Sequence, residues 1–183
     1  TLASFEARLR GQDDHTAAEA AYEIGQMLLS GAVSVEQSRR SGAIRGLLNV
    51  LGEGSSPATR AQAASALRNA AATAAAGGCA ETASLGDEPG LLEALVPALM
   101  PEAGPEGDSD ALLAQGFASA ALWSLASLPQ NRAKIAVVPG LLQALAYAAE
   151  DPAAGPGLLV PVTGTMLCVA SDANARALLR AMP

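Results

Sequence analysis

Three ten-residue stretches of the chain share one pattern of apolar and polar positions. Each begins with glycine, continues with two apolar residues and has a polar or charged residue fourth; they span residues 42–51, 90–99 and 140–149. Their starts lie 48 and 50 residues apart. A recurrence on this scale is typical of helical repeat proteins, in which each unit buries its apolar face against its neighbours. The pattern therefore predicts an all-α chain built from repeats.

Each repeat is expected to contain a short, a medium and a long helix. In the second repeat, Ser34 and Gln37 have the spacing of a capping box and predict the start of the short helix. Gly42 is expected to end that helix, and residues 43–51 form the medium one.

The long helix of this repeat is predicted to begin after Ser56, with Pro57 at its first position, and to run to about residue 73. Its apolar positions fall on one helical face and predict its buried side. They are Ala63, Ala66, Leu67 and Ala70.

The other repeats follow the same order. We expect a medium helix at 2–10, long helices at 16–30, 110–128 and 158–171, and short helices at 79–85, 131–138 and 172–181. Thr16 and Glu19 suggest a capping box at the first long helix. Residues 100–109 are rich in proline, glycine and acidic residues, which predicts an exposed loop. The boundaries are a partial repeat 1–42, repeats 43–89 and 90–139, and a partial repeat 140–183.

Composition narrows the possible partners. Half of the chain is apolar but only 3% is aromatic, so an alanine-rich core of closely packed helices is expected. The net charge of −7 argues against nucleic acid, because phosphate binding needs clustered lysine and arginine.

Two apolar stretches, 111–128 and 153–171, approach the length of a membrane span. The first is rich in small residues and the second is interrupted by glycine and proline, so we interpret both as buried helices and expect no membrane span. The chain has no signal peptide, lacks an initiator methionine and stops where a repeat would begin. These features predict a segment of a longer repeat protein.

Few residues are candidates for chemistry. His15 is the only histidine, and with Asp13 and Asp14 it does not complete a metal-ligand set. Cys79 and Cys168 lack the spacing of a redox motif, and a reducing compartment is the simpler interpretation. No nucleophile elbow or phosphate-binding loop is present. We therefore expect no enzyme activity, no cofactor and no metal.

At this point the chain resembles the armadillo repeat family. The resemblance is carried by Gly42-Ala43-Ile44 with the leucines that follow, by the segment 66–71 (ALRNAA), and by 131–135 (NRAKI) leading into Pro139-Gly140. It implies a right-handed α-solenoid of about three and a half three-helix repeats. It also implies a concave groove, lined by the long helices, that binds peptides, helices or whole domains.

In many armadillo proteins an asparagine two residues after the core leucine of a long helix holds the backbone of a bound peptide. Asn69 is the match here, and Gln26, Ser124 and Val169 stand at the equivalent positions. The tryptophan that import receptors carry four residues earlier is replaced by Tyr22, Ser65, Ala120 and Thr165. The chain therefore does not resemble a nuclear import receptor.

Helical geometry supports the same positions. If Ile24, Leu67, Leu122 and Leu167 are the core residues, the residues two before and two after each lie on one side of the long helix and face the groove. Together with Trp123, the predicted partner-binding residues are Tyr22, Gln26, Ser65, Asn69, Trp123, Ser124 and Thr165. Two alternatives stay open: Trp123 fills the core, and Asn69 braces one repeat against the next.

Two functions remain. The first is a cytoplasmic protein–protein interaction scaffold that holds a partner segment in its groove, and a nuclear location is also compatible with it. The alternative is a structural subunit held permanently in a large ciliary, cytoskeletal or organellar assembly.

Overall fold

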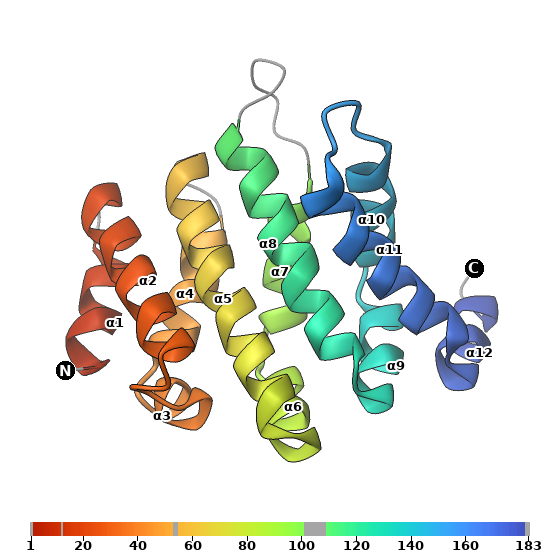
Figure 1. The fold of residues 1–183 in the computed structure, drawn as a ribbon, viewed down its shortest axis with the longest axis horizontal. Coiled ribbons are helices and arrows are strands. Elements are labelled where there is room, and N and C mark those ends of the chain that lie inside the picture. The colour runs from red at the N-terminus through yellow and green to blue at the C-terminus, as the bar shows by residue number, and fades with distance from the viewer. Residues whose placement is uncertain (1, 12, 53–54, 101–108, 182–183) are drawn as a thin grey trace.

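The computed structural model describes residues 2–11, 13–52, 55–100 and 109–181. Within those ranges the chain forms twelve α-helices and no strand, which confirms the all-α prediction (Figure 1). The helices are α1 (Leu2–Arg10), α2 (Asp14–Leu29), α3 (Val35–Arg40), α4 (Ala43–Leu51), α5 (Pro57–Gly77), α6 (Cys79–Gly86), α7 (Leu91–Leu99), α8 (Ser109–Ala126), α9 (Pro129–Val137), α10 (Leu141–Glu150), α11 (Pro156–Ser171) and α12 (Ala173–Ala181).

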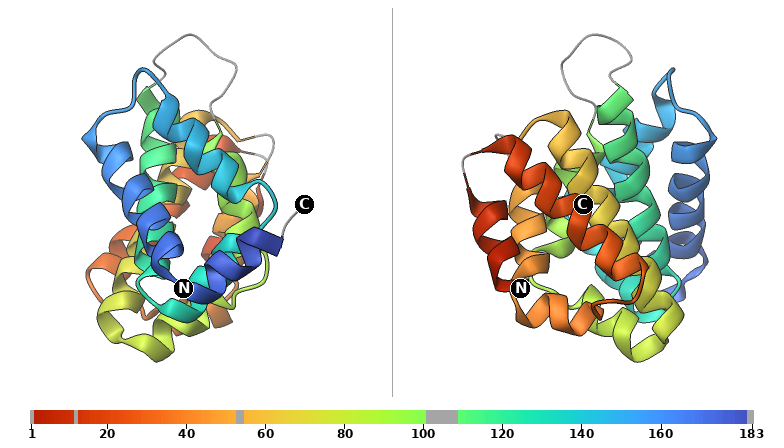
Figure 2. Two further views of the ribbon diagram at one scale, coloured as in Figure 1. Left: turned by 90° about the vertical axis from the view of Figure 1, so that its right-hand side faces the viewer. Right: turned by 60° about the vertical axis from the view of Figure 1, so that its left-hand side comes forward.

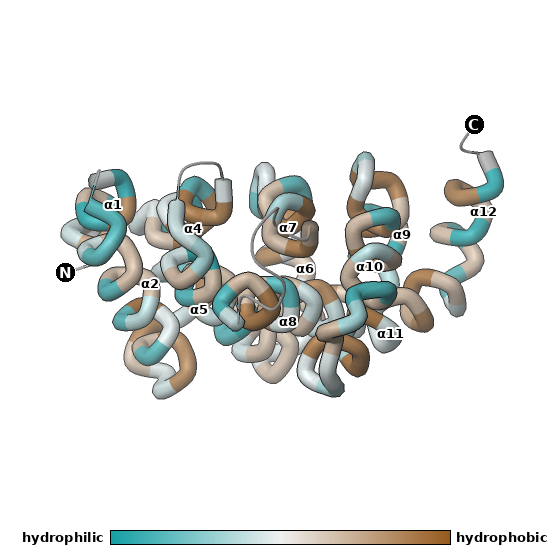
Figure 3. The backbone as a smooth tube through the Cα atoms, turned by 90° about the horizontal axis from the view of Figure 1, so that it is seen from above, coloured by the Kyte–Doolittle hydropathy of each residue, from teal (hydrophilic) through white to brown (hydrophobic). Residues whose placement is uncertain are grey.

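The helices lie in two layers. The long helices α2, α5, α8 and α11 lie side by side in one layer, and α1, α4, α7 and α10 form the other (Figures 1 and 3). The short helices α3, α6, α9 and α12 follow one edge, and the two termini lie at opposite ends (Figure 1). The end view in Figure 2 shows α10 and α11 in different layers.

The predicted helix starts agree with the structure where the cap is strong. Ser34 and Gln37 form the expected capping box at α3. The hydroxyl of Ser56 accepts the backbone N–H of Thr59 at 3.2 Å and caps α5, whose first residue is Pro57. Both caps satisfy N–H groups that have no partner within the helix.

The predicted start of α2 is wrong. Asp13, not Thr16, is the cap: its carboxylate accepts the backbone N–H of Thr16 at 3.0 Å, and the helix begins at Asp14. Aspartate is as good a cap as serine or threonine, and here it stands three residues earlier.

Two further boundaries differ from the prediction. The helix α5 continues past residue 73 to Gly77, because alanines 74–76 extend it without cost. Pro129 does not merely end α8 but stands at the first position of α9, where its missing N–H is tolerated. The predicted loop 100–109 lies mostly outside the described residues.

The medium helices α4, α7 and α10 all begin after a glycine in the left-handed conformation. The φ angles of Gly42, Gly90 and Gly140 are 78°, 80° and 79°. Only glycine adopts this region freely, so the shared glycine of the three repeated stretches has a direct backbone reason.

The core lies between the two layers. Leucine and isoleucine of the medium helices meet alanine-rich faces of the long helices, and Leu67 and Leu122 are buried as predicted. The helices α5 and α8 pack most extensively, and both are rich in buried alanine, for example Ala63 and Ala70 of α5 and Ala118 and Ala121 of α8. Small side chains allow such close approach and bury most of the helix surface.

The stretches that approach the length of a membrane span are helices α8 and α11. Among the described residues no single helix is both long and apolar enough to cross a bilayer. The α11 and α12 helices meet the length and composition requirement only as a pair, and they are bent by 87° relative to each other.

Candidate partner-binding face of the long helices

A hollow of about 220 Å³ opens between α2, α5 and α8. It gathers four of the seven predicted partner-binding residues, which come from two adjacent long helices: Tyr22, Gln26, Ser65 and Asn69. The remaining wall includes Arg68 from α5 and Asp110, Leu113 and Phe117 from α8. The register inferred from Ile24 and Leu67 therefore places these four residues around one concavity.

These four residues differ in exposure. Tyr22 is 54% exposed and Gln26 is also exposed, whereas Ser65 is half-buried. Asn69 is only 5% exposed. Tyr22 and Gln26 are therefore accessible at the surface, and Ser65 lies deeper in the wall.

Asn69 is bonded within the fold. Its Nδ2 donates to the carbonyl oxygen of Gly25 at 3.0 Å, so the side chain ties α5 to α2. A Cβ atom on Gly25 would lie 3.3 Å from the Cα of Ala66, which shows how closely the two helices cross here. This geometry matches the bracing alternative for Asn69.

Arg68 is a site residue that the sequence analysis did not select. Its Nε and Nη2 donate to the Oδ1 of Asn69 at 3.3 and 3.0 Å, and its guanidinium lies 4.7 Å from the centre of the Phe117 ring. The ring belongs to α8, so contacts from two helices orient the arginine in the wall of the hollow.

The predicted α8 residues lie outside this hollow. Trp123 is 43% exposed and its indole covers Gly164 of α11, where a Cβ would lie 2.6 Å from the ring. Trp123 is therefore partly packed between two long helices and partly exposed. Ser124 is half-buried beside it in sequence.

Thr165 does not face the surface, so this prediction is wrong. It is fully buried and its hydroxyl donates to the carbonyl oxygen of Pro161 at 2.8 Å. Leu167, taken as the core residue, is 69% exposed, and Val169 is buried instead. The buried positions of α11 are Leu158, Pro161, Val162, Thr165 and Val169, a helical spacing offset from the predicted register.

Large apolar side chains are exposed on three of the four long helices. On α2 and α8 they include residues that line the hollow, and on α11 they lie on the side that the shifted register turns outward. The set is Tyr22, Leu29, Leu113, Trp123, Val160, Met166 and Leu167.

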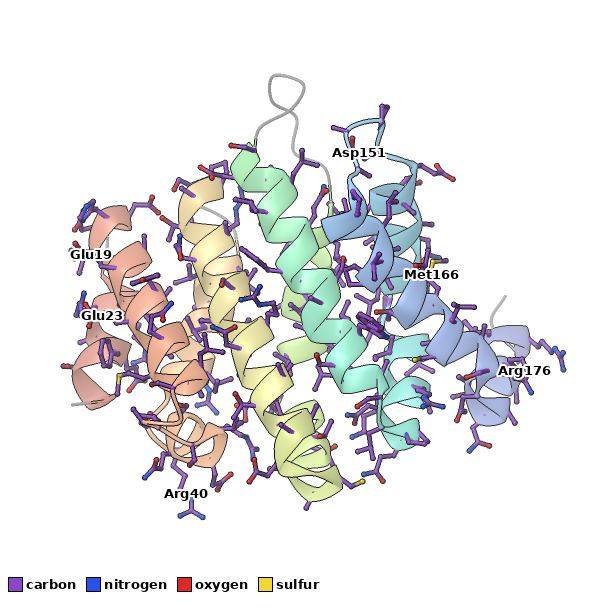
Figure 4. The ribbon with its side chains drawn as sticks, viewed as in Figure 1. Glu19, Glu23, Arg40, Asp151, Met166 and Arg176 are labelled. Carbon is purple, nitrogen blue, oxygen red and sulfur yellow. The ribbon has the colours of Figure 1, made fainter. Side chains whose placement is uncertain are left out.

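Hydrogen bonds to the carboxylate of Asp14 connect the start of α2 to the start of α5. The carboxylate of Asp14 accepts the Thr59 hydroxyl at 2.7 Å and also the hydroxyl and backbone N–H of Ser56. The Ser56 and Thr59 hydroxyls lower the pKa of Asp14 below its ordinary value. On the outer side of α2, Arg8 pairs with Glu19 and Glu23, which Figure 4 shows at the edge of the molecule.

The other residues considered for catalysis or metal binding do not line the hollow. His15 is exposed, with its Nδ1 3.6 Å from a carboxylate oxygen of Glu19. Cys79 is exposed, and Cys168 is half-buried against the core. Across the ranges that the structure describes, no three histidine, cysteine or acidic side chains are grouped to hold a metal ion.

Comparisons with protein-family models, with curated proteins and with solved structures returned no match to this chain.

Proposed function

We propose that the chain is part of an armadillo-type α-solenoid and acts as a non-enzymatic scaffold that binds a segment of a partner protein. The order of short, medium and long helix recurs along the chain, and each medium helix after α1 begins at a glycine of nearly the same φ. Both features support a repeat architecture.

A hydrogen bond from an arginine to the end of a long helix occurs twice and also supports the repeat architecture. Arg132 donates to the carbonyl oxygen of Ala126 at 2.7 Å, and Arg176 donates to that of Ala170 at 2.7 Å. In each case the arginine stands six residues after the carbonyl and binds the last turn of a long helix. A cation at a helix C-terminus satisfies open carbonyls and opposes the negative end of the dipole.

The observation that carries the binding function is the hollow and its apolar surroundings. Monomeric proteins normally expose large apolar residues singly, and a concentration of them beside a concavity is typical of interaction surfaces. Tyr22 and Leu113 border the hollow and remain half exposed, and Arg68 and Gln26 supply polar contacts. Aromatic residues and arginine are the types that dominate binding energy at interfaces.

The test uses two tyrosines of equal exposure. Tyr22 on α2 and Tyr147 on α10 are each 54% exposed but lie in different layers. Peptides would be selected from a random library on the intact chain and then measured against Tyr22→Ala and Tyr147→Ala. We expect Tyr22→Ala alone to lower affinity, by about tenfold, as truncation of an aromatic anchor does.

The assembly subunit is the second candidate. It is favoured by apolar side chains exposed on the other helices, namely Val137 of α9 and Tyr147 of α10. In that case stable partners cover both layers, and a stoichiometric complex purified from cells would protect amides around both Tyr22 and Tyr147. Protection confined to the long helices would favour the scaffold.

A further inference from the structure

We propose that the hollow between α2, α5 and α8 binds a carboxylate group of the partner segment, with Arg68 as its principal donor. This inference rests on the proposed function and adds to it the chemistry of the partner. It follows from the orientation of Arg68, from its missing counter-charge and from the size of the hollow.

Arg68 is held in place before any partner arrives. Two of its N–H groups donate to the Oδ1 of Asn69, and the amide of Asn69 is itself fixed by the Gly25 carbonyl. The Phe117 ring supports one face of the guanidinium at 4.7 Å. An arginine that is already ordered loses little side-chain entropy when it binds a ligand.

Arg68 also retains unused hydrogen-bonding capacity. A guanidinium carries five N–H donors, and among the residues that the structure describes only two of those of Arg68 have partners, both bonded to one amide oxygen. Within the described part of the chain Arg68 forms no ion pair, although several other arginines do: Arg8, Arg10, Arg39 and Arg40. A half-buried cation without a carboxylate is stabilised when a ligand supplies one.

The size of the hollow limits the ligand. Its volume of about 220 Å³ is below the 300–1,000 Å³ that is typical of small-molecule sites, and suits one side chain or a chain terminus. Tyr22, Gln26 and Ser65 line the same hollow and can donate to a second carboxylate oxygen. An aspartate or glutamate side chain therefore fits the site.

One wall residue is acidic. Asp110 stands seven residues before Phe117 on α8, about 10 Å along the helix axis from the ring that supports Arg68. Asp110 therefore stands about two helical turns away from the part of α8 that supports the guanidinium.

This site contrasts with the charge of the whole chain. A net charge of −7 attracts basic segments over long distances. Arg68 selects an acidic residue at short range, where specificity is decided. The two influences predict opposite compositions for bound peptides, which makes the proposal testable.

The experiment compares peptides selected on three proteins. A random twelve-residue library would be selected on the intact chain, on Arg68→Gln and on Arg45→Gln, which removes one exposed arginine from α4 as a matched control. We expect the intact chain and Arg45→Gln to enrich peptides with Asp or Glu at one fixed position, and Arg68→Gln to lose this preference.

A peptide selected on the intact chain then allows a double-mutant cycle. Exchanging its acidic residue for the amide should weaken binding by about tenfold or more on the intact chain and hardly at all on Arg68→Gln. The effect of the acid-to-amide exchange in the peptide can be measured on the intact chain alone. This measurement therefore tests the carboxylate site even if Arg68→Gln fails to fold.

The outcomes separate the two proposals. Peptides that are basic at every position, or acidic peptides that bind equally well after the amide exchange, would overturn the carboxylate site and leave the scaffold intact. Peptides whose affinity is unaffected by Tyr22→Ala would instead remove the proposed binding face.

Discussion

The α2–α5 pair and the α8–α11 pair of long helices are held together by different interactions. Between α2 and α5 the contacts are polar at three levels: Asp14 with Ser56 and Thr59, Asn69 with Gly25, and Thr73 with the carbonyl of Leu28 at 3.4 Å. These bonds are directional and fix how the two helices face each other.

The α8–α11 pair relies on close apolar contact. The indole of Trp123 covers Gly164, and a Cβ on Gly116 would lie 3.3 Å from the carbonyl oxygen of Gly157. The hydroxyls of Thr163 and Thr165 donate to carbonyls within α11 itself. Apolar packing of this kind depends on shape and is sensitive to a single added methyl group.

Both pairs use a glycine where a large side chain of the neighbouring helix crosses. In one pair that side chain is an amide that bonds to the glycine carbonyl, and in the other it is an indole that lies over the glycine. The same close approach therefore produces a polar joint at one end and an apolar, volume-sensitive joint at the other.

The largest effect should come from the core leucine of α8. Leu122 is fully buried, so Leu122→Ala should lower the free energy of unfolding by about 2–4 kcal/mol. Leu167 of α11 is 69% exposed, so Leu167→Ala should change it by less than about 0.5 kcal/mol. Urea unfolding of both variants measures the difference, and equal losses would show that the observed register of α11 is wrong.

A methyl group at the α8–α11 glycine should have the next largest effect. In Gly164→Ala the new Cβ meets the Trp123 ring at 2.6 Å, which forces the ring aside and should cost about 1–3 kcal/mol. Trp123 is the only tryptophan, so its emission should shift toward that of exposed indole.

Gly25→Ala is the matched change at the α2–α5 pair. Its Cβ would lie 3.3 Å from its nearest neighbour, and the gain in helix propensity of roughly 1 kcal/mol offsets the crowding. We expect stability within about 1 kcal/mol of the parent chain. A larger loss of stability in Gly25→Ala than in Gly164→Ala would show that the α2–α5 pair, and not the α8–α11 pair, is sensitive to added volume.

The helices themselves could be predicted from the sequence because their signals are local. Caps such as Ser34 and Ser56, and the glycines before the medium helices, act within one turn of the chain. The register of α11 could not be predicted. Residues 156–171 contain no charge, so apolar periodicity does not distinguish its faces, and packing against α8 and α10 decides that Leu167 faces outward.

The candidate site was only partly predictable for a related reason. Tyr22, Gln26, Ser65 and Asn69 share a simple helical spacing that a sequence reveals. Arg68 differs, because its orientation depends on Phe117, which is 49 residues away in sequence and on another helix. The burial of Asn69 was likewise a consequence of the Gly25 crossing.

Asn69→Ala tests the central polar contact of the α2–α5 pair. Loss of the bond to Gly25 should lower the free energy of unfolding by about 1–2 kcal/mol, in the range of a buried hydrogen bond. Ser65→Ala, one turn earlier on the wall of the same hollow, should change stability by less than about 0.5 kcal/mol. Unchanged stability of Asn69→Ala would show that the bond to Gly25 does not brace α5 against α2.

The smallest effect is the acid sensitivity of the α2–α5 pair. Hydrogen bonds from Ser56 and Thr59 lower the pKa of Asp14 in the folded chain below its value in the unfolded chain. The hydrogen bonds to ionised Asp14 therefore stabilise the fold at a pH above the unfolded-state pKa of about 3.9. This stabilisation is lost as the pH falls through the pKa of the folded state. The protection of amides in α2 and α5, measured as exchange relative to the intrinsic rate at each pH, should therefore fall below about pH 4, while Trp123 emission, which reports on α8 and α11, changes later. The Asp14→Asn variant should remove part of this acid dependence, because an amide does not titrate. If both pairs loosened at the same pH in both proteins, the polar contacts of Asp14 would not distinguish the two ends.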